Sequence, residues 1–150
     1  MSDKLKINED LNLLNSIVGL IDSARHKVAT VVNQELTLLY WHIGKKINED
    51  VLYNERADYG KKIILDLSKQ LSEKYGAGFN KRNLHSFIKL NSVIQDLTIA
   101  QTLSAQLSWP HLQSAINIEN SIKREFYIQM AIHERWSVRT KPRWNYTFYG

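Results

Sequence analysis

The sequence predicts an all-α protein, with a long N-terminal helix or helix pair and a helix-turn-helix-like unit. Apolar residues recur at steps of three and four along most of the chain, as they do on one face of an α-helix. The 150 residues include only two prolines and six glycines, and few segments alternate Val or Thr as β-strands do. With 43% hydrophobic residues, the chain can bury one core of ordinary domain size.

The N-terminal third carries the longest helical pattern. Gly19 and Arg25 interrupt its apolar stripe, so that one helix and two helices both fit. An uninterrupted helix would be ~60 Å long and would need a partner along it. We expect the stripe to pack in the domain's own core, with dimerisation through it as the alternative. A break is expected at Tyr53–Asn54. The stripe consists of Leu11, Leu14, Val18, Ile21, Val28, Val32, Leu36, Leu39, Ile43, Ile47 and Val51.

Two further helices are expected on either side of a glycine-containing turn. Asp58 fits the N-cap of the first of them, and Gly76 fits its C-terminal end, where glycine readily adopts a left-handed conformation. Asn80 can cap the second, which runs from Lys81 to about Leu90. Together, residues 58–90 have the outline of a helix-turn-helix, although plain α-hairpins share that outline.

Shorter helical segments follow. Ser108 fits an N-cap, with Pro110 in the first turn, where a missing N–H costs little. The segment Ile122–Trp136 is apolar nearly all round, so we expect it to be a central helix. Pro142 and the aromatic residues after it do not continue a helix. Four aromatic residues at helical positions are expected in the core rather than as ligand platforms: Tyr40, Trp41, Trp109 and Trp136.

The positive charge is concentrated in one part of the chain. The net charge is +5. Between Gly60 and Lys89 there are seven Lys or Arg residues and two acidic ones, which gives 7 − 2 = +5, so this segment accounts for the whole net charge. A basic segment of this kind favours a polyanionic partner.

The helix expected after Asn80 divides into two faces. Leu84, Phe87 and Ile88 share one side and would seat the helix on the core. The other side suits DNA, because cations neutralise phosphates while Arg, Asn and Ser reach base edges. An ordinary solvated basic face is the alternative. Three residues are candidates for phosphate contacts: Lys81, Arg82 and Lys89. Three are candidates for base or sugar contacts: Asn83, His85 and Ser86.

No catalytic, metal or cofactor motif was found in the sequence. The chain has no cysteine, which excludes disulfides and thiolate metal sites and fits a reducing, cytoplasmic setting. The five histidines lack metal-site spacing, and phosphate-loop and nucleophile-elbow motifs do not occur. None of the eight glutamates precedes a lysine by two residues, as PDDEXK nucleases require. No apolar run is long enough for a membrane span, and the first residues are too polar for a secretory signal. We therefore expect no enzyme activity, no cofactor and no membrane partner.

Five segments occur in the same order and spacing as in the YhcG-type proteins: LLYWHIGKKI, RADYGKKIILDLSKQL, GFNKRNLHSF, QTLSAQLSWPHL and REFYIQMAIHERWSVR. Over about residues 10–139 the sequence resembles the N-terminal domain of that family, which precedes a C-terminal PDDEXK nuclease domain. The resemblance implies an all-α domain over 1–139 that supplies DNA binding or assembly to a DNA nuclease. The nuclease half is not among these residues, and 140–150 form a divergent tail.

Two functional hypotheses follow from the sequence. The first is a non-catalytic DNA-binding module that would bring a nuclease to its substrate through the basic face after Asn80. The second is an assembly domain without nucleic-acid binding, in which the long first helix and the Tyr40-Trp41 run mediate self-association or dock a partner.

Overall fold

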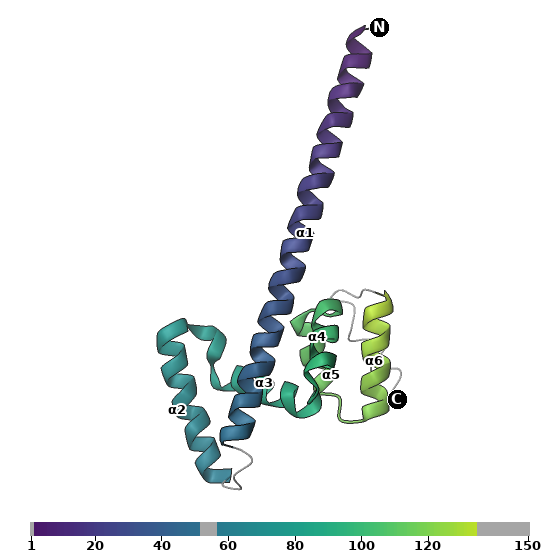
Figure 1. Ribbon diagram of the computed structural model, residues 1–150. Coiled ribbons are helices and arrows are strands. Elements are labelled where there is room, and N and C mark those ends of the chain that lie inside the picture. Colours follow the sequence, from purple (N-terminus) through teal and green to yellow (C-terminus); the bar gives the residue numbers. More distant parts are fainter. Residues whose placement is uncertain (1, 52–56, 135–150) are drawn as a thin grey trace.

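The computed structural model describes residues 2–51 and 57–134, and every regular element in these ranges is a helix. The all-α prediction is therefore confirmed for this part of the chain. Figure 1 shows a long first helix with the shorter helices gathered around its C-terminal part. The elements are α1 (Ser2–Asp50), α2 (Ala57–Tyr75), the 3₁₀ helix η2 (Ala77–Phe79), α3 (Lys81–Val93), α4 (Leu97–Gln106), α5 (Trp109–Ile116) and α6 (Ser121–Glu134).

Helix α1 is one continuous helix, which Gly19 and Arg25 do not interrupt. Its side chains from residue 3 to residue 32 are all exposed, and we call this segment the arm. Most of the arm projects clear of the other helices (Figure 1). The expectation that the whole apolar stripe packs in the domain's own core is therefore wrong for the arm, and also for Leu36 and Leu39, which are 43% and 44% exposed. The shorter helices, of 8 to 19 residues, bury side chains only in the part of α1 that follows the arm, although residues 105–108 lie beside its last turns at His26, Ala29 and Thr30.

The C-terminal part of α1 crosses α3 at very short range. A Cβ atom built on Gly44 would lie 1.8 Å from the backbone oxygen of Phe87, so only glycine allows this approach. Three residues earlier, Trp41 is 1% exposed and its Nε1 donates a hydrogen bond to the Ile94 carbonyl at 2.6 Å. These contacts fix α3 against α1.

The core consists of two neighbouring clusters. One contains Trp41 with apolar residues of α3, α4, α5 and α6, and the other contains Ile47 and Val51 with residues of α2 and α3. The Tyr40 ring contacts both clusters, and it stacks on Phe87 with ring centroids 4.3 Å apart. Tyr40 and Trp41 therefore serve the core, as expected, and Trp41 is not available to dock a partner.

Local sequence signals set most helix boundaries. Helix α2 ends before Gly76, which has a φ of +94°, and Asn80 caps α3 by accepting a hydrogen bond from the Asn83 N–H at 2.9 Å. Both predictions are confirmed. Asp58 is not the predicted N-cap, because α2 already begins at Ala57. The predicted break at Tyr53–Asn54 lies outside the described residues.

Helix α6 differs from the prediction of a central helix. Tyr127, Ile128 and Ala131 are buried, but Ile122 is 80% exposed and Phe126 is 38% exposed. The helix covers one side of the core and leaves part of its apolar surface outside. Trp136, Pro142 and the tail 140–150 lie outside the described residues.

Asn33 joins α1 to two other helices at the base of the arm. Its Nδ2 donates to the carbonyl oxygens of Ser104 and Leu107 at 3.2 and 3.0 Å, at the C-terminal end of α4. Its Oδ1 accepts a hydrogen bond from the Trp109 N–H at 3.1 Å, at the first residue of α5. Ser108 occupies the N-cap position of α5, as predicted, but its side chain makes no capping bond, and Asn33 accepts from the start of the helix instead.

Replacing Asn33 with alanine should lower the free energy of unfolding by about 2 to 3 kcal/mol, because three hydrogen bonds are lost at about 1 kcal/mol each. Urea unfolding followed by circular dichroism measures this change. Asn15→Ala, on the exposed arm, is the matched control and should stay within about 0.5 kcal/mol of the wild type. Equal effects of the two substitutions would contradict the capping role.

Candidate nucleic-acid interface

Helix α3 presents its basic side outward because its apolar side is buried. Leu84, Phe87 and Ile88 are 0%, 2% and 8% exposed, so the prediction that they seat the helix on the core is confirmed. Phe87 packs between Tyr40 of α1 and Trp109 of α5, with ring centroids 4.3 and 5.9 Å away. These ring contacts hold α5 beside α3.

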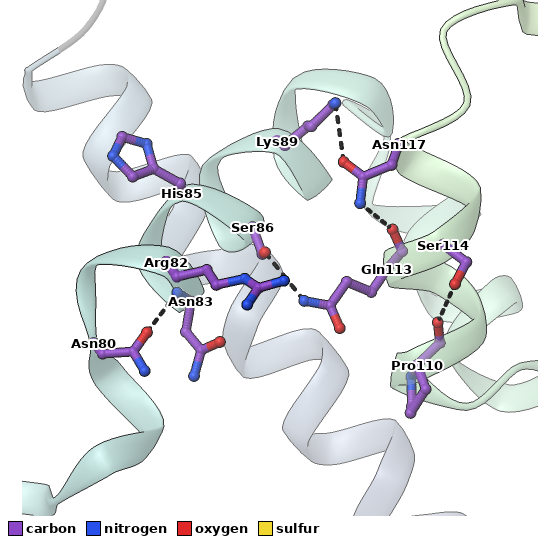
Figure 2. Close-up of a pocket in the computed structure, with 10 residues that line it drawn as sticks. All are labelled: Asn80, Arg82, Asn83, His85, Ser86, Lys89, Pro110, Gln113, Ser114 and Asn117. Atoms are coloured by element: carbon purple, nitrogen blue, oxygen red, sulfur yellow. Dashed lines mark hydrogen bonds between the residues drawn. The ribbon is translucent and has the colours of Figure 1, made fainter. Parts of the chain in front are cut away.

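An open groove of about 870 Å³ lies between α3 and α5. Figure 2 shows Arg82 extending from α3 toward Gln113 of α5, with Lys89 at the far end of the same helix. None of the ten residues that line the groove is acidic. They are Asn80, Arg82, Asn83, His85, Ser86, Lys89, Pro110, Gln113, Ser114 and Asn117.

Hydrogen bonds across the groove hold its two walls together. Gln113 Nε2 donates to Ser86 Oγ at 3.2 Å, and Lys89 Nζ donates to Asn117 Oδ1 at 3.0 Å (Figure 2). Asn117 is itself held by a 2.8 Å bond from its Nδ2 to the Gln113 carbonyl. The positions of the polar groups are therefore set before any ligand binds.

The structure brings five of the six sequence-predicted site residues to this groove. Lys81 is exposed but does not line it. Asn83 is partly committed to the turn before α3, because its Nδ2 donates to the Gly78 carbonyl at 3.1 Å. The predicted residues that line the groove are Arg82, Asn83, His85, Ser86 and Lys89.

Sequence reasoning missed the contribution of α5. The second wall of the groove consists of Gln113 and Ser114 of α5 and of Asn117, which directly follows that helix. They carry no charge and match no motif, so a search for charged clusters passes over them. The signal available in the sequence was the polar surface that these three residues form beside His111 and Leu112, which are buried.

The wall formed by α5 is anchored to α6. Ser114 makes a side-chain hydrogen bond with Tyr127, a buried residue whose hydroxyl also lies 3.3 Å from His111 Nδ1. Burial raises the pKa of the Tyr127 hydroxyl above its ordinary value of 10.0, and the hydrogen bond between Tyr127 and Ser114 opposes this rise. Tyr127 is therefore neutral at physiological pH and acts in packing.

The described part of the chain contains neither a metal-binding cluster nor a membrane-spanning helix. Among residues 2–51 and 57–134, no group of three or more His, Asp or Glu residues could hold a metal ion. No helix within these ranges is both long and apolar enough to cross a membrane. The arrangement of cations and neutral hydrogen-bond donors in the groove is suited to binding anions such as phosphates.

Comparison with known protein families gives a match to one family over most of the chain. The profile of the family described as the DUF1016 N-terminal domain matches residues 16–144. The chain belongs to the DUF1016 N-terminal domain family. The match begins at Ser16, inside the arm, and includes α2 to α6. This membership confirms the resemblance drawn from the five sequence segments.

A curated relative of this DUF1016 N-terminal domain is the Escherichia coli (strain K12) protein named "Putative nuclease YhcG". The two are 29% identical over 159 aligned positions, which cover 86% of this chain and 42% of the relative. The chain therefore spans less than half the length of that protein. No solved structure matches the chain.

Proposed function

We propose that this DUF1016 N-terminal domain binds DNA in the groove between α3 and α5 and does not itself catalyse a reaction. Arg82 and Lys89 would contact phosphates from the groove, and Lys81 would contact a third phosphate beside it. The amide and hydroxyl groups of Gln113 and Ser86 would donate to phosphate or sugar oxygens. In a longer family member, this binding would bring the nuclease domain to its substrate.

The observation that supports this proposal best is the composition of the groove. Two helices bring cations together with neutral donors in a space that no acidic side chain lines. Binding of duplex DNA by such a surface depends on the release of counterions from the phosphates. The name of the Escherichia coli relative adds support, because a nuclease acts on nucleic acid.

The test is fluorescence anisotropy with a labelled duplex of about 20 base pairs, titrated at several salt concentrations. The wild type is compared with the Lys81→Ala/Arg82→Ala/Lys89→Ala variant. Loss of three phosphate contacts should reduce the slope of log K against log salt by about 2.7. The matched control is Lys4→Ala/Lys6→Ala/Lys27→Ala, which removes the same charge from the arm.

The control variant should bind DNA nearly as tightly as the wild type. Equal losses in the two triple variants would show that net charge alone drives binding, and binding insensitive to salt would contradict phosphate contacts. A labelled RNA duplex of the same length is measured in parallel, and tighter binding of RNA would overturn the assignment to DNA.

Self-association is a second candidate function, supported by the apolar residues exposed along the arm. Its experimental signature differs from that of DNA binding. Association through apolar contacts depends on protein concentration and is nearly insensitive to salt. The arm and the groove are formed by different residues, so that the two activities can be measured separately.

A further inference from the structure

The arm carries more exposed apolar surface than a free helix in water tolerates. Six residues of its stripe are 44% to 63% exposed: Leu11, Leu14, Val18, Ile21, Val28 and Val32. Contiguous apolar surface of this kind marks an interaction site. A helix also gains most of its stability from packing its apolar face, so an unpaired arm would be only marginally stable.

The spacing of the stripe suits a second helix of the same type. From Leu11 to Val32 the stripe advances by alternating steps of three and four, which is the heptad pattern of a coiled coil. The one polar position in this register is Arg25, between Ile21 and Val28. Over three heptads, this pattern indicates pairing of helices rather than packing on a flat surface.

The charge of the arm argues against a polyanionic occupant. Residues 3–32 contain four acidic residues and four Lys or Arg residues, so their net charge is zero. DNA and anionic lipid surfaces attract basic segments. A neutral apolar stripe instead matches another neutral apolar stripe, and a second copy of this chain supplies one.

Arg25 selects the direction of the pairing. In a parallel, in-register pair, Arg25 would face the same arginine of the second copy inside the seam, which like-charge repulsion disfavours. In an antiparallel pair it faces the N-terminal half of the other arm, where Glu9 and Asp10 lie. In this direction, carboxylates of the other arm are available to each Arg25.

The length of the arm sets how far apart the packed parts of the two copies lie. The exposed segment runs from residue 3 to residue 32, and its midpoint falls between Ile17 and Val18. Two arms that pair in opposite directions overlap along most of this segment. The packed parts of the two copies, which begin at Asn33, would then lie at opposite ends, about 45 Å apart along the helix axis.

We infer that two copies of this chain pair through their arms as an antiparallel coiled coil. This pairing uses none of the groove residues, so it goes beyond the proposed DNA binding. It gives the dimer one α3–α5 groove at each end. The pairing is measured without nucleic acid, so its failure and the failure of DNA binding are separate results.

Sedimentation equilibrium tests the pairing. The wild-type chain should have twice its 17.5 kDa mass, and Leu14→Glu/Ile21→Glu should return it to 17.5 kDa. The matched control, Ser16→Glu/Ser23→Glu, places the same two charges seven residues apart on the opposite face and should remain dimeric. A monomeric wild type would overturn the inference and indicate a different partner. Equal dissociation in both variants would also overturn it.

A single spin label tests the direction, because the chain has no cysteine of its own. With Asn8→Cys labelled, the antiparallel pair separates the two labelled backbone positions by about 30 Å. A parallel pair keeps them about 10 Å apart, which is the spacing of packed helices. Electron–electron resonance distances near the longer value support the antiparallel pair, and distances near the shorter value overturn it.

Discussion

Replacing Gly44 with alanine should destabilise this protein by about 3 kcal/mol, which is at the upper end of the range for overpacked cores. The added methyl group would lie 1.8 Å from the Phe87 backbone oxygen, and backbone cannot rotate away as a side chain can. Helices α1 and α3 would have to separate. Because α3 forms one wall of the groove, DNA binding should weaken along with stability.

Urea unfolding of Gly44→Ala beside Gly19→Ala makes the comparison within one helix. Nothing lies within 4 Å of a Cβ built on Gly19, so alanine there should be neutral or stabilise the helix by about 0.5 to 1 kcal/mol. A Gly44→Ala variant as stable as the wild type would show that α1 and α3 do not cross this closely.

The second large effect concerns the α5 wall. Gln113→Glu/Asn117→Asp should weaken DNA binding about 100-fold, because the contacts of Arg82 and Lys89 with phosphates are lost, at about 1.5 kcal/mol each. The new carboxylates would pair with Arg82 and Lys89 and repel phosphates, while nearly preserving side-chain shape. Ser86 can still donate a hydrogen bond to the residue at position 113.

Fluorescence anisotropy at one fixed salt concentration measures this loss. Gln101→Glu/Gln106→Glu is the matched control, because it adds two negative charges at exposed positions of α4. It should reduce affinity only slightly. Equal reduction in both double variants would show that DNA does not enter the groove and responds only to net charge.

The features that could be predicted from the sequence are those encoded within one helix or turn. Gly76 and Asn80 bound the turn before α3 through conformational freedom and a side-chain cap, and both are set by nearby residues. The buried side of α3 follows from helical periodicity at Leu84, Phe87 and Ile88. The same periodicity predicts that the basic residues of α3 share one face of the helix, away from the buried side chains.

Other features depend on which helices meet, which periodicity does not encode. The stripe along α1 is uniform in sequence, yet Leu36 and Leu39 are still 43% and 44% exposed, and only its last members, Ile47 and Val51, are buried. Apolar residues on all sides of α6 predicted a central helix, but Ile122 remains on the surface. Gln113 and Asn117 became candidate site residues only because Tyr40, Phe87 and Trp109 bring α5 beside α3.

Titration of the ¹⁵N-labelled protein with a duplex of about 20 base pairs, followed by amide NMR, tests most directly whether the groove is the DNA-binding site. The largest shift changes should fall on residues 80–89 of α3 and 113–117 of α5. Amides of the arm and of α2 should change little. Changes centred instead on the lysines of α2, such as Lys61, Lys62 and Lys69, would contradict binding in the groove, as would a spectrum that DNA leaves unchanged.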